Sequence, residues 1–378
     1  MKITTIKWLL FIVILSTKTL IAQELPPKEP SPIDVKQIHS GHSLTDPLFH
    51  PWPGQYRYLI YDILNGNYDN LGKATVPGSP MFWRWDNEHT LDPSARFDIQ
   101  NWELLIITEG IPIPDDGNTP PQITPAKEYL SNYVNNAWIN GNNGNGAATL
   151  LWTTWTNIDD SDGPWRQMID EYEVLWEEMM DYANDNRPDG ATPVYIIPGH
   201  RMMAQLYDDI QSGLVPGITS IDDFFSDTIH LNDLGAYAMA MIHYACIYNE
   251  SPVGITNNLF AQNDQENKDI PSMELANYLQ TMIWQVVINY SRTGITDETL
   301  SINDNAKPNT IDCVFPNPAK DKLTICNNDK DNTDKVIIFD LTGKIMLSTY
   351  QTEIDIRDLS SGYYFISKGG KFSKFIKL

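Results

Sequence analysis

The feature that most constrains the fold is a series of short apolar segments that alternate with helical patterns between residues 34 and 250. Three of these segments, LLIIT, TLLWTTW and VYIIP, are nearly continuous apolar runs. Runs of this length are typical of strands that are covered on both faces. Such strands occur in parallel sheets, whose crossover connections are usually helices. The pattern therefore predicts an α/β domain with three layers, in which helices cover both faces of a parallel sheet.

The individual segments follow this alternation along the chain. Strands are expected at 34–40, 71–79, 102–110, 146–157 and 192–199. Helices are expected at 55–66, 125–139, 165–186, 232–249 and 271–292, the last of them capped by Ser272.

The N-terminal residues 1–22 have the features of a signal peptide. Lys2 and Lys7 form a positive end, the run WLLFIVIL is short for a bilayer, and Ala22 precedes the expected cleavage point. An uncleaved membrane anchor is the less favoured alternative. Cleavage would leave no integral membrane segment and implies export. The proline-rich residues 23–33 then form a flexible extended lead to the main domain.

The sequence pattern changes near residue 296. The main domain is expected to span 34–295, and a polar linker follows at 296–310. From 311 to 378 the chain consists of short β-type runs separated by turns. This pattern predicts a small all-β sandwich at the C-terminal end.

Composition excludes one class of partner. The chain has 26 Lys and Arg against 49 Asp and Glu, a net charge of −23. It would repel phosphate backbones, so nucleic acid is excluded as a partner. The 11 Trp and 18 Tyr residues fit either an aromatic core or a stacking surface for sugars.

The three cysteines give no metal-ligand pattern. Cys313 and Cys326 could form a bridge within the C-terminal region, and Cys246 lies in an apolar helical stretch where it would be buried and inert. No CxxC or HExxH motif occurs, so we expect neither a metal nor another cofactor.

Polar residues gather where the expected strands end. Gly78, Glu109 and Asn157 lie at the carboxyl ends of these segments, and Ser43 and His200 lie just past two others. The carboxyl ends of parallel strands meet at one edge of a sheet, where ligands bind. A single binding site at this edge is therefore predicted.

The chemistry that suits these residues is acyl transfer. A serine hydroxyl such as that of Ser43 is a weak nucleophile and needs a base, which His230 can supply. Asp227, three residues before His230, can hold the imidazole in the right tautomer. The backbone N–H groups of Ser43 and Gly78 are candidates for the oxyanion hole.

Ordinary structural roles remain open for each of these residues. Ser43 could be a helix N-cap, and Asp227 could be an ordinary loop residue. His230 could simply precede a last helix that Asn232 caps, and Asn157 could be a turn residue. Taken as a set in this order, the residues favour a catalytic site.

Two blocks of the sequence, SGHSLTD and SDTIHLND, resemble those of the SGNH (GDSL-type) hydrolase superfamily. The family's first block carries a nucleophilic serine after Gly-x, which Gly41 and Ser43 match. Its last block is Asp-x-x-His, which Asp227 and His230 match, and its oxyanion glycine corresponds to Gly78. The resemblance covers residues 34–250 and implies an SGNH-hydrolase-like fold with a serine esterase site.

The sequence departs from the family at two positions. Pro112 stands where the family has an oxyanion-hole asparagine, and proline has no N–H to donate. His42 replaces the usual Asp or Asn before the nucleophile. We expect Asn157 to substitute as the oxyanion donor.

The rim of the site is predicted from residues near these blocks. The residues expected to contact substrate are His42, Trp83, Arg84 and Glu109. Packing in the core is the alternative role for Trp83, and a buried structural carboxylate is the alternative for Glu109.

The C-terminal runs VFPNPAKDKLTI and IDIRDLSSGYYFISKGGKFSKFIKL resemble the type A C-terminal sorting domain of the type IX secretion pathway. The resemblance covers residues 311–378. It implies transit through the periplasm and the outer membrane with the type IX machinery as partner, and then a secreted or cell-surface location.

Together these features predict a secreted serine hydrolase that cleaves an ester through a serine acyl-enzyme. A small-molecule or polysaccharide ester is the expected substrate, and a carbohydrate O-acetyl ester is the first choice because the protein is exported and rich in aromatic residues. The alternative is a non-catalytic surface protein that binds glycan through the same cleft, which the missing asparagine would favour.

Overall fold

The computed structural model describes residues 25–52, 55–64, 68–111, 113, 123–160, 163–259, 269–296, 311, 314–325, 335–340, 345–368 and 371–378. The expected signal peptide and Pro112, Cys313 and Cys326 lie outside these residues. The chain divides into two compact units between residues 299 and 300. None of the helices in these ranges has the length and the hydropathy that crossing a bilayer requires.

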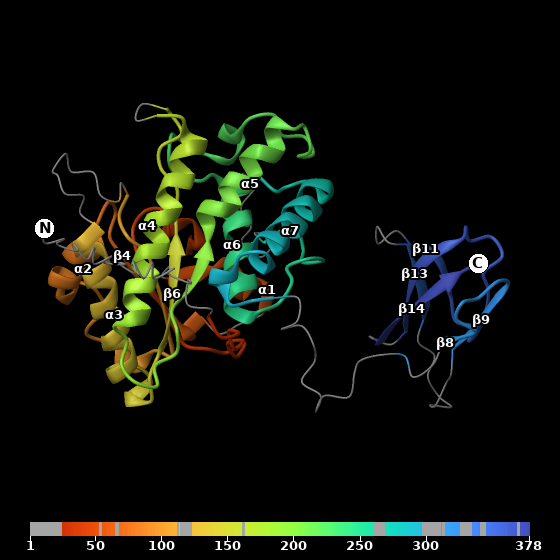
Figure 1. Ribbon diagram of the computed structural model, residues 1–378, viewed down its shortest axis with the longest axis horizontal. Helices are drawn as coiled ribbons and strands as arrows, with labels where there is room; N and C mark the ends of the chain where they lie inside the picture. Colours follow the sequence, from red (N-terminus) through yellow and green to blue (C-terminus); the bar gives the residue numbers. More distant parts are fainter. Residues whose placement is uncertain are drawn as a thin grey trace, which may run out of the picture. The chain divides into compact units, whose positions relative to one another are not determined.

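The first unit is built around a five-stranded parallel sheet, which confirms the predicted α/β fold (Figure 1). The strand order is β4-β1-β5-β6-β7. The strands are β1 (Gln37–Gly41), β4 (Leu71–Thr75), β5 (Leu104–Ile107), β6 (Ala148–Thr153) and β7 (Tyr195–Pro198). Because the chain adds β4 on one side of β1 and β5 on the other, the carboxyl end of β1 is the topological switch point of the sheet, where ligands bind in open parallel sheets.

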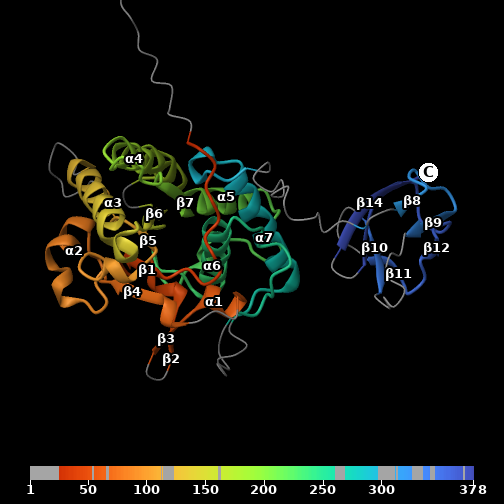
Figure 2. The ribbon, with the colours of Figure 1, turned by 90° about the horizontal axis from the view of Figure 1, so that it is seen from below.

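Helices cover both faces of this sheet (Figure 2). One face carries α2 (Met81–Asn87), α3 (Ile123–Gly144) and α4 (Trp165–Asp185). The other carries α1 (Leu59–Leu64), α5 (Gly199–Gln211), α6 (Asp233–Tyr248) and α7 (Met273–Ile288). Ser272 caps α7 as predicted, since its side chain accepts a hydrogen bond from the Leu275 N–H.

Two helices were not expected from the sequence, and one expected helix begins as a strand. α2 and α5 are additional, and α5 starts at Gly199 directly after β7 ends. The segment 55–66 starts as β3 (Gln55–Tyr58), which pairs with β2 (Phe49–Trp52), and only then becomes α1. Tyrosine-rich segments favour strands, which the helical spacing of the apolar residues obscured.

Alternating side chains of the central strands serve two separate cores. Leu104 and Ile106 of β5 belong to the core under α5, α6 and α7. Leu105 and Ile107 belong to the core under α3 and α4. The strand period of two residues thus explains why this run is apolar throughout.

The extended lead is docked on the first unit rather than free. The Lys28 ammonium is buried and donates to the Ile247 carbonyl at 3.1 Å and to Asn249 Oδ1 at 2.9 Å. Burial lowers the pKa of Lys28 to about 8. The neighbouring Cys246 is a buried free thiol, as expected, and burial raises its pKa to about 12.

The second unit is the predicted small all-β domain. It has a four-stranded antiparallel sheet in the order β11-β10-β13-β14 and a three-stranded sheet in the order β12-β9-β8. Its strands are β8 (Val314–Phe315), β9 (Lys322–Ile325), β10 (Val336–Phe339), β11 (Ile345–Thr349), β12 (Glu353–Asp355), β13 (Gly362–Lys368) and β14 (Lys371–Lys377). A core of its own forms around Ile338, Ile366 and Phe375.

Two histidines, His39 of β1 and His243 of α6, lie inside the core, and His243 has the structural role expected of it. The His243 and His39 rings are stacked with their centroids 6.1 Å apart, and Trp152 lies 4.4 Å from His243. His243 Nδ1–H donates to the Met239 carbonyl at 2.9 Å. Burial lowers the pKa of His243 to about 3 and lowers that of His39 as well.

These histidines predict acid-sensitive stability. The unfolded chain takes up protons near pH 6.5 that the folded core excludes, so stability is complete above this pH and falls as the pH decreases toward 3. Each such histidine should steepen the loss by up to about 1.4 kcal/mol per pH unit. Urea unfolding between pH 7 and pH 4 should show a shallower loss for His243→Phe than for the wild type. The exposed His89→Phe is the control, and equal slopes for all three proteins would contradict the prediction.

Candidate active site

The structure brings Ser43, His230 and Asp227 together in one hydrogen-bonded chain. His230 Nε2 lies 2.9 Å from Ser43 Oγ, and His230 Nδ1 lies 2.7 Å from Asp227 Oδ2. Ser43 is in the turn after β1, at the switch point of the sheet, and the other two residues are in the loop before α6. This is the arrangement that activates a serine hydroxyl.

Asp227 fixes the tautomer of the histidine. Its Oδ1 accepts hydrogen bonds from the backbone N–H groups of His230 at 2.7 Å and Ile229 at 2.9 Å. These bonds hold the pKa of the Asp227 carboxyl down, to about 2. The ionised carboxylate accepts the Nδ1–H of His230, which leaves Nε2 as the base that faces Ser43.

The segment after β6 anchors the loop that carries Asp227 and His230. The Trp155 indole N–H donates to the Ile229 carbonyl at 2.9 Å, and the Ile158 N–H donates to the Thr228 carbonyl at 2.8 Å. The Thr228 hydroxyl donates to Asn157 Oδ1 at 3.1 Å. Asn157 therefore lies beside the catalytic loop, but Trp155 and Thr228 carry no sequence signal that identifies them as its supports.

The turn after β1 carries Ser43. The Thr45 N–H donates to the His42 carbonyl at 2.8 Å. A Cβ on Gly41 would stand 2.2 Å from Thr45 Oγ1, so the turn requires glycine there. The short helix that follows has Thr45 as its N-cap, which excludes the alternative that Ser43 is the cap.

Asn232 is the N-cap of α6, which is the structural role that the sequence left open for it, and the Ser43–His230–Asp227 contacts form as well. Its side-chain oxygen accepts hydrogen bonds from the N–H groups of Leu234 at 3.0 Å and Gly235 at 3.1 Å and so caps α6. The cap fixes where α6 begins, three residues after His230.

His42 lies behind the nucleophile and is not on the rim of the site. It is buried, its Nε2–H donates to the Glu109 carbonyl at 2.8 Å, and its Nδ1 accepts the Leu44 N–H at 3.3 Å. Burial and the positive charge of Arg84 lower the pKa of His42 to about 4. The neutral ring thus supports the turn, and the expectation that it contacts substrate does not fit its burial.

Arg84 of α2 is fully buried and joins three strand ends. Its Nε–H donates to Ser40 Oγ at 3.1 Å, at the end of β1. Its other two nitrogens donate to the backbone carbonyls of Ser79, in the turn after β4, and Thr108, after β5. The guanidinium is occupied by these bonds, so it positions the loops instead of contacting substrate.

Glu109, whose backbone carbonyl accepts the hydrogen bond of His42, is also buried. Its Oε1 accepts the N–H groups of Met81 at 2.7 Å and Gly110 at 2.6 Å, and burial raises the pKa of its carboxyl. The alternative of a structural carboxylate therefore fits better than substrate contact.

Gly78 and Trp83 are at the surface. Gly78 has a φ of +67° and follows Pro77 in a turn closed by the Ser79 N–H, which donates to the Val76 carbonyl at 3.2 Å. Trp83 on α2 is 39% exposed. Of the four residues expected to contact substrate, Trp83 is the one whose side chain can do so.

His200 lies away from this site. Its Nδ1 is 2.6 Å from the Thr153 hydroxyl and its Nε2 is 3.0 Å from Glu173 Oε2, so it joins β6, α4 and α5. It is buried at the start of α5. The sequence placed it past a strand end, but the side chain points between the helices.

Comparison with known proteins identifies the C-terminal unit first. Residues 313–377 match the family model of the secretion system C-terminal sorting domain. The C-terminal unit is a secretion sorting domain. This sorting domain confirms the prediction from the sequence, and it implies export of the protein to the cell surface or into the medium. No curated protein matches the chain in sequence.

Solved structures resemble the first unit at low identity. A DUF4886 family protein from Bacteroides uniformis is 11% identical with a TM-score of 0.44, covering 70% of this chain and 98% of its own. A protein from Slackia heliotrinireducens described as an SGNH hydrolase is 12% identical with a TM-score of 0.37, covering 56% and 97%. An acetyl xylan esterase is 14% identical with a TM-score of 0.38, covering 56% and 99%. These likenesses do not determine the reaction, because one fold serves many reactions.

The hydrogen bonds of Arg84 predict that even a conservative substitution lowers the stability of the protein substantially. Arg84→Lys should lower the free energy of unfolding by about 2–4 kcal/mol, because one ammonium group cannot serve three strand ends and leaves buried acceptors unpaired. Urea unfolding measures this change. Arg166→Lys, at a partly exposed guanidinium with surface ion pairs, is the matched control and should cost about 1 kcal/mol or less. Equal stability of the Arg84→Lys variant and the wild type would contradict the positioning role.

Proposed function

We propose that the exported protein is a serine ester hydrolase that works through an acyl-enzyme on Ser43. The observation that carries this proposal is the chain of hydrogen bonds from Asp227 through His230 to Ser43 Oγ. The position of Ser43 at the switch point of the sheet supports it, because substrates reach parallel sheets at this place.

The reaction would proceed in two steps. His230 Nε2 accepts the proton of Ser43 Oγ while the oxygen attacks the ester carbonyl. The tetrahedral intermediate then releases the alcohol, which takes the proton back from His230. In the second step a water gives its proton to His230 and attacks the acyl group, so that Ser43 is restored and the carboxylic acid leaves.

The oxyanion is assigned to the N–H groups of Ser43 and Gly78 and to the side-chain amide of Asn157. The Asn157 oxygen accepts the Thr228 hydroxyl, and this bond leaves the amide N–H₂ group for another acceptor. Gly78 is exposed in its turn after β4. Asn157 then supplies the donor that Pro112 cannot.

The substrate we propose is a carbohydrate O-acetyl ester. Export places the protein among extracellular polymers, and the exposed Trp83 ring on α2 offers a flat apolar face for a sugar ring. The second candidate is a non-catalytic glycan-binding protein. The proline at position 112 favours this candidate, and the measurements below distinguish the two.

Removal of the nucleophile or the base should abolish turnover. We expect Ser43→Ala and His230→Ala to lower kcat for a short-chain aryl ester by about 10⁴-fold or more, and Asp227→Asn to lower it by a similar order through the wrong tautomer. Steady-state kinetics on the purified variants measures this. A serine-reactive phosphonate should label Ser43 in the wild type and not in His230→Ala. Activity that persists in both alanine variants would reject the proposal, and a folded wild type without activity on aryl or acetylated sugar esters would favour glycan binding.

The oxyanion assignment predicts a selective effect at Asn157. Asn157→Ala should lower kcat by about 10²–10³-fold with little change in KM, because the donor acts on charge that develops in the transition state. Thr228→Val, which removes the hydroxyl that orients the amide, should show a smaller loss of the same kind. A wild-type kcat for the Asn157→Ala variant would show that Asn157 is not the third oxyanion donor.

A further inference from the structure

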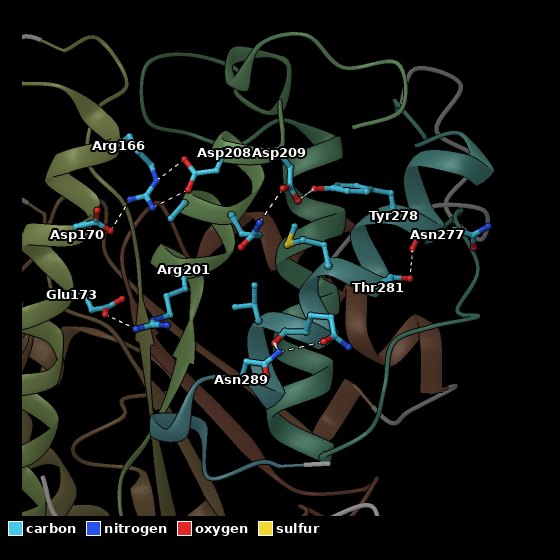
Figure 3. A pocket seen from close by; sticks show the side chains of 15 residues that line it. Arg166, Asp170, Glu173, Arg201, Asp208, Asp209, Asn277, Tyr278, Thr281 and Asn289 are labelled. Atoms are coloured by element: carbon cyan, nitrogen blue, oxygen red, sulfur yellow. Dashed lines mark hydrogen bonds and ion pairs between the residues drawn. The ribbon is translucent and has the colours of Figure 1, made fainter. Parts of the chain in front are cut away.

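A groove lies between α4, α5 and α7 (Figure 3), and none of the residues that line it belongs to the triad. Its volume is about 820 Å³, within the range of small-molecule binding sites. The groove is lined from α4 by Arg166, Asp170 and Glu173, from α5 by Arg201, Ala204, Gln205, Asp208 and Asp209, and from α7 by seven residues between Asn277 and Asn289. None of these residues takes part in the proposed reaction.

The charged groups on the α4 and α5 side are already committed to one another. Arg166 Nε–H donates to Asp208 Oδ1 at 2.9 Å, and its Nη1 donates to Asp170 at 2.6 Å. Arg201 Nη2 donates to Glu173 Oε1 at 2.5 Å. Both guanidinium groups therefore have carboxylate partners, and an anionic ligand would have to displace them.

The α7 side of the groove carries no charge. Asn277, Thr281, Gln285 and Asn289 recur at every fourth residue and form an exposed polar stripe along the helix. The chain has 75 charged residues in all, 26 Lys and Arg plus 49 Asp and Glu, so an exposed stripe of three amides and a hydroxyl is unusual for it. The charged residue that α7 also exposes, Glu274, lies in its first turn and does not line the groove. The Thr281 hydroxyl and the Asn289 amide donate to carbonyl groups of the helix itself. The amides of Asn277 and Gln285 can both donate and accept hydrogen bonds, which complements a ligand rich in hydroxyl groups.

Apolar surface completes the groove. Ala204 of α5 and Met282 and Val286 of α7 form its apolar part. The Tyr278 ring is held in place because its hydroxyl donates to Asp209 Oδ2 at 2.5 Å. A fixed ring and an aliphatic floor suit the C–H faces of sugar rings, while the amide stripe suits their hydroxyl groups.

The groove is connected to the catalytic loop through one layer of aromatic side chains. Trp165, which precedes Arg166, lies with its ring 6.2 Å from that of Phe225. The next residue, Ser226, donates its N–H to the His230 carbonyl at 2.8 Å. The groove and the loop of His230 are thus linked through packed side chains.

We propose that this groove binds an uncharged carbohydrate chain. It is a second, non-catalytic site that would retain polymeric substrate while acyl groups are removed at Ser43. Its role as a substrate anchor rests on the proposed function, but carbohydrate binding in the groove does not.

Isothermal titration of the full-length protein with xylohexaose, cellohexaose and mannohexaose tests the proposal, with hexagalacturonate as the anionic comparison. At least one neutral oligosaccharide should bind better than hexagalacturonate. The double variant Asn277→Ala/Gln285→Ala should weaken that binding roughly tenfold through the lost amide hydrogen bonds. Both positions are exposed on a helix, where alanine is well tolerated.

Gln167→Ala is the matched control, because it removes an exposed amide from α4 outside the groove. It should leave binding unchanged, and aryl-ester hydrolysis should be unchanged in all of these variants. Absence of binding by the wild type to all three neutral oligosaccharides, equal binding by the double variant, or a preference for hexagalacturonate would overturn the proposal. If the proposed ester hydrolysis is wrong but the groove proposal is right, the protein will be inactive toward aryl esters and will still bind oligosaccharide.

Discussion

The hydrogen bond between Ser43 and His230 is the constraint on which the rest of the first unit depends. It joins residues 187 positions apart at 2.9 Å, so two surface loops must be held in place from independent sides. The nucleophile's turn is fixed from below by Arg84 and His42. The loop of the base is fixed from the side by Trp155. The hydrogen bonds within each loop would not by themselves hold Ser43 and His230 this accurately at hydrogen-bonding distance.

The residues that support the turn of Ser43 are buried polar side chains. Arg84 and Glu109 place one positive and one acidic side chain in the interior. Arg84 donates to the Ser40 hydroxyl and to two backbone carbonyls, and Glu109 Oε1 accepts two backbone N–H groups. Burying such groups is costly unless they are hydrogen-bonded, so the arrangement tolerates little displacement. The result is a rigid platform beneath a half-buried serine. The catalytic loop, by contrast, is exposed, which leaves Asp227 and His230 accessible to a substrate.

The sequence predicted the sheet, because apolar runs mark buried strands. It also predicted a triad of Ser43, His230 and Asp227 from the order of their blocks, and the structure places these three side chains within hydrogen-bonding distance. It did not predict α5, since Pro198 and Gly199 pass from strand to helix without a loop to mark the change. It also placed Arg84, Glu109 and His42 on the rim of the site. The sequence shows that a residue follows a strand, but it does not show where the side chain points. Whether a side chain points to solvent or into the interior depends on partners such as Ser40 and Met81, which only the fold brings near.

The most direct test of the account is to trap the acyl-enzyme. A reaction of the full-length protein with p-nitrophenyl acetate, quenched in acid during steady state and digested for mass spectrometry, should show one acetyl group on the peptide that contains Ser43, located at Ser43. The Ser43→Ala variant should show none. Ester hydrolysis without acetylation of Ser43, or with the acetyl group on another residue, would contradict the assignment of Ser43 as the nucleophile.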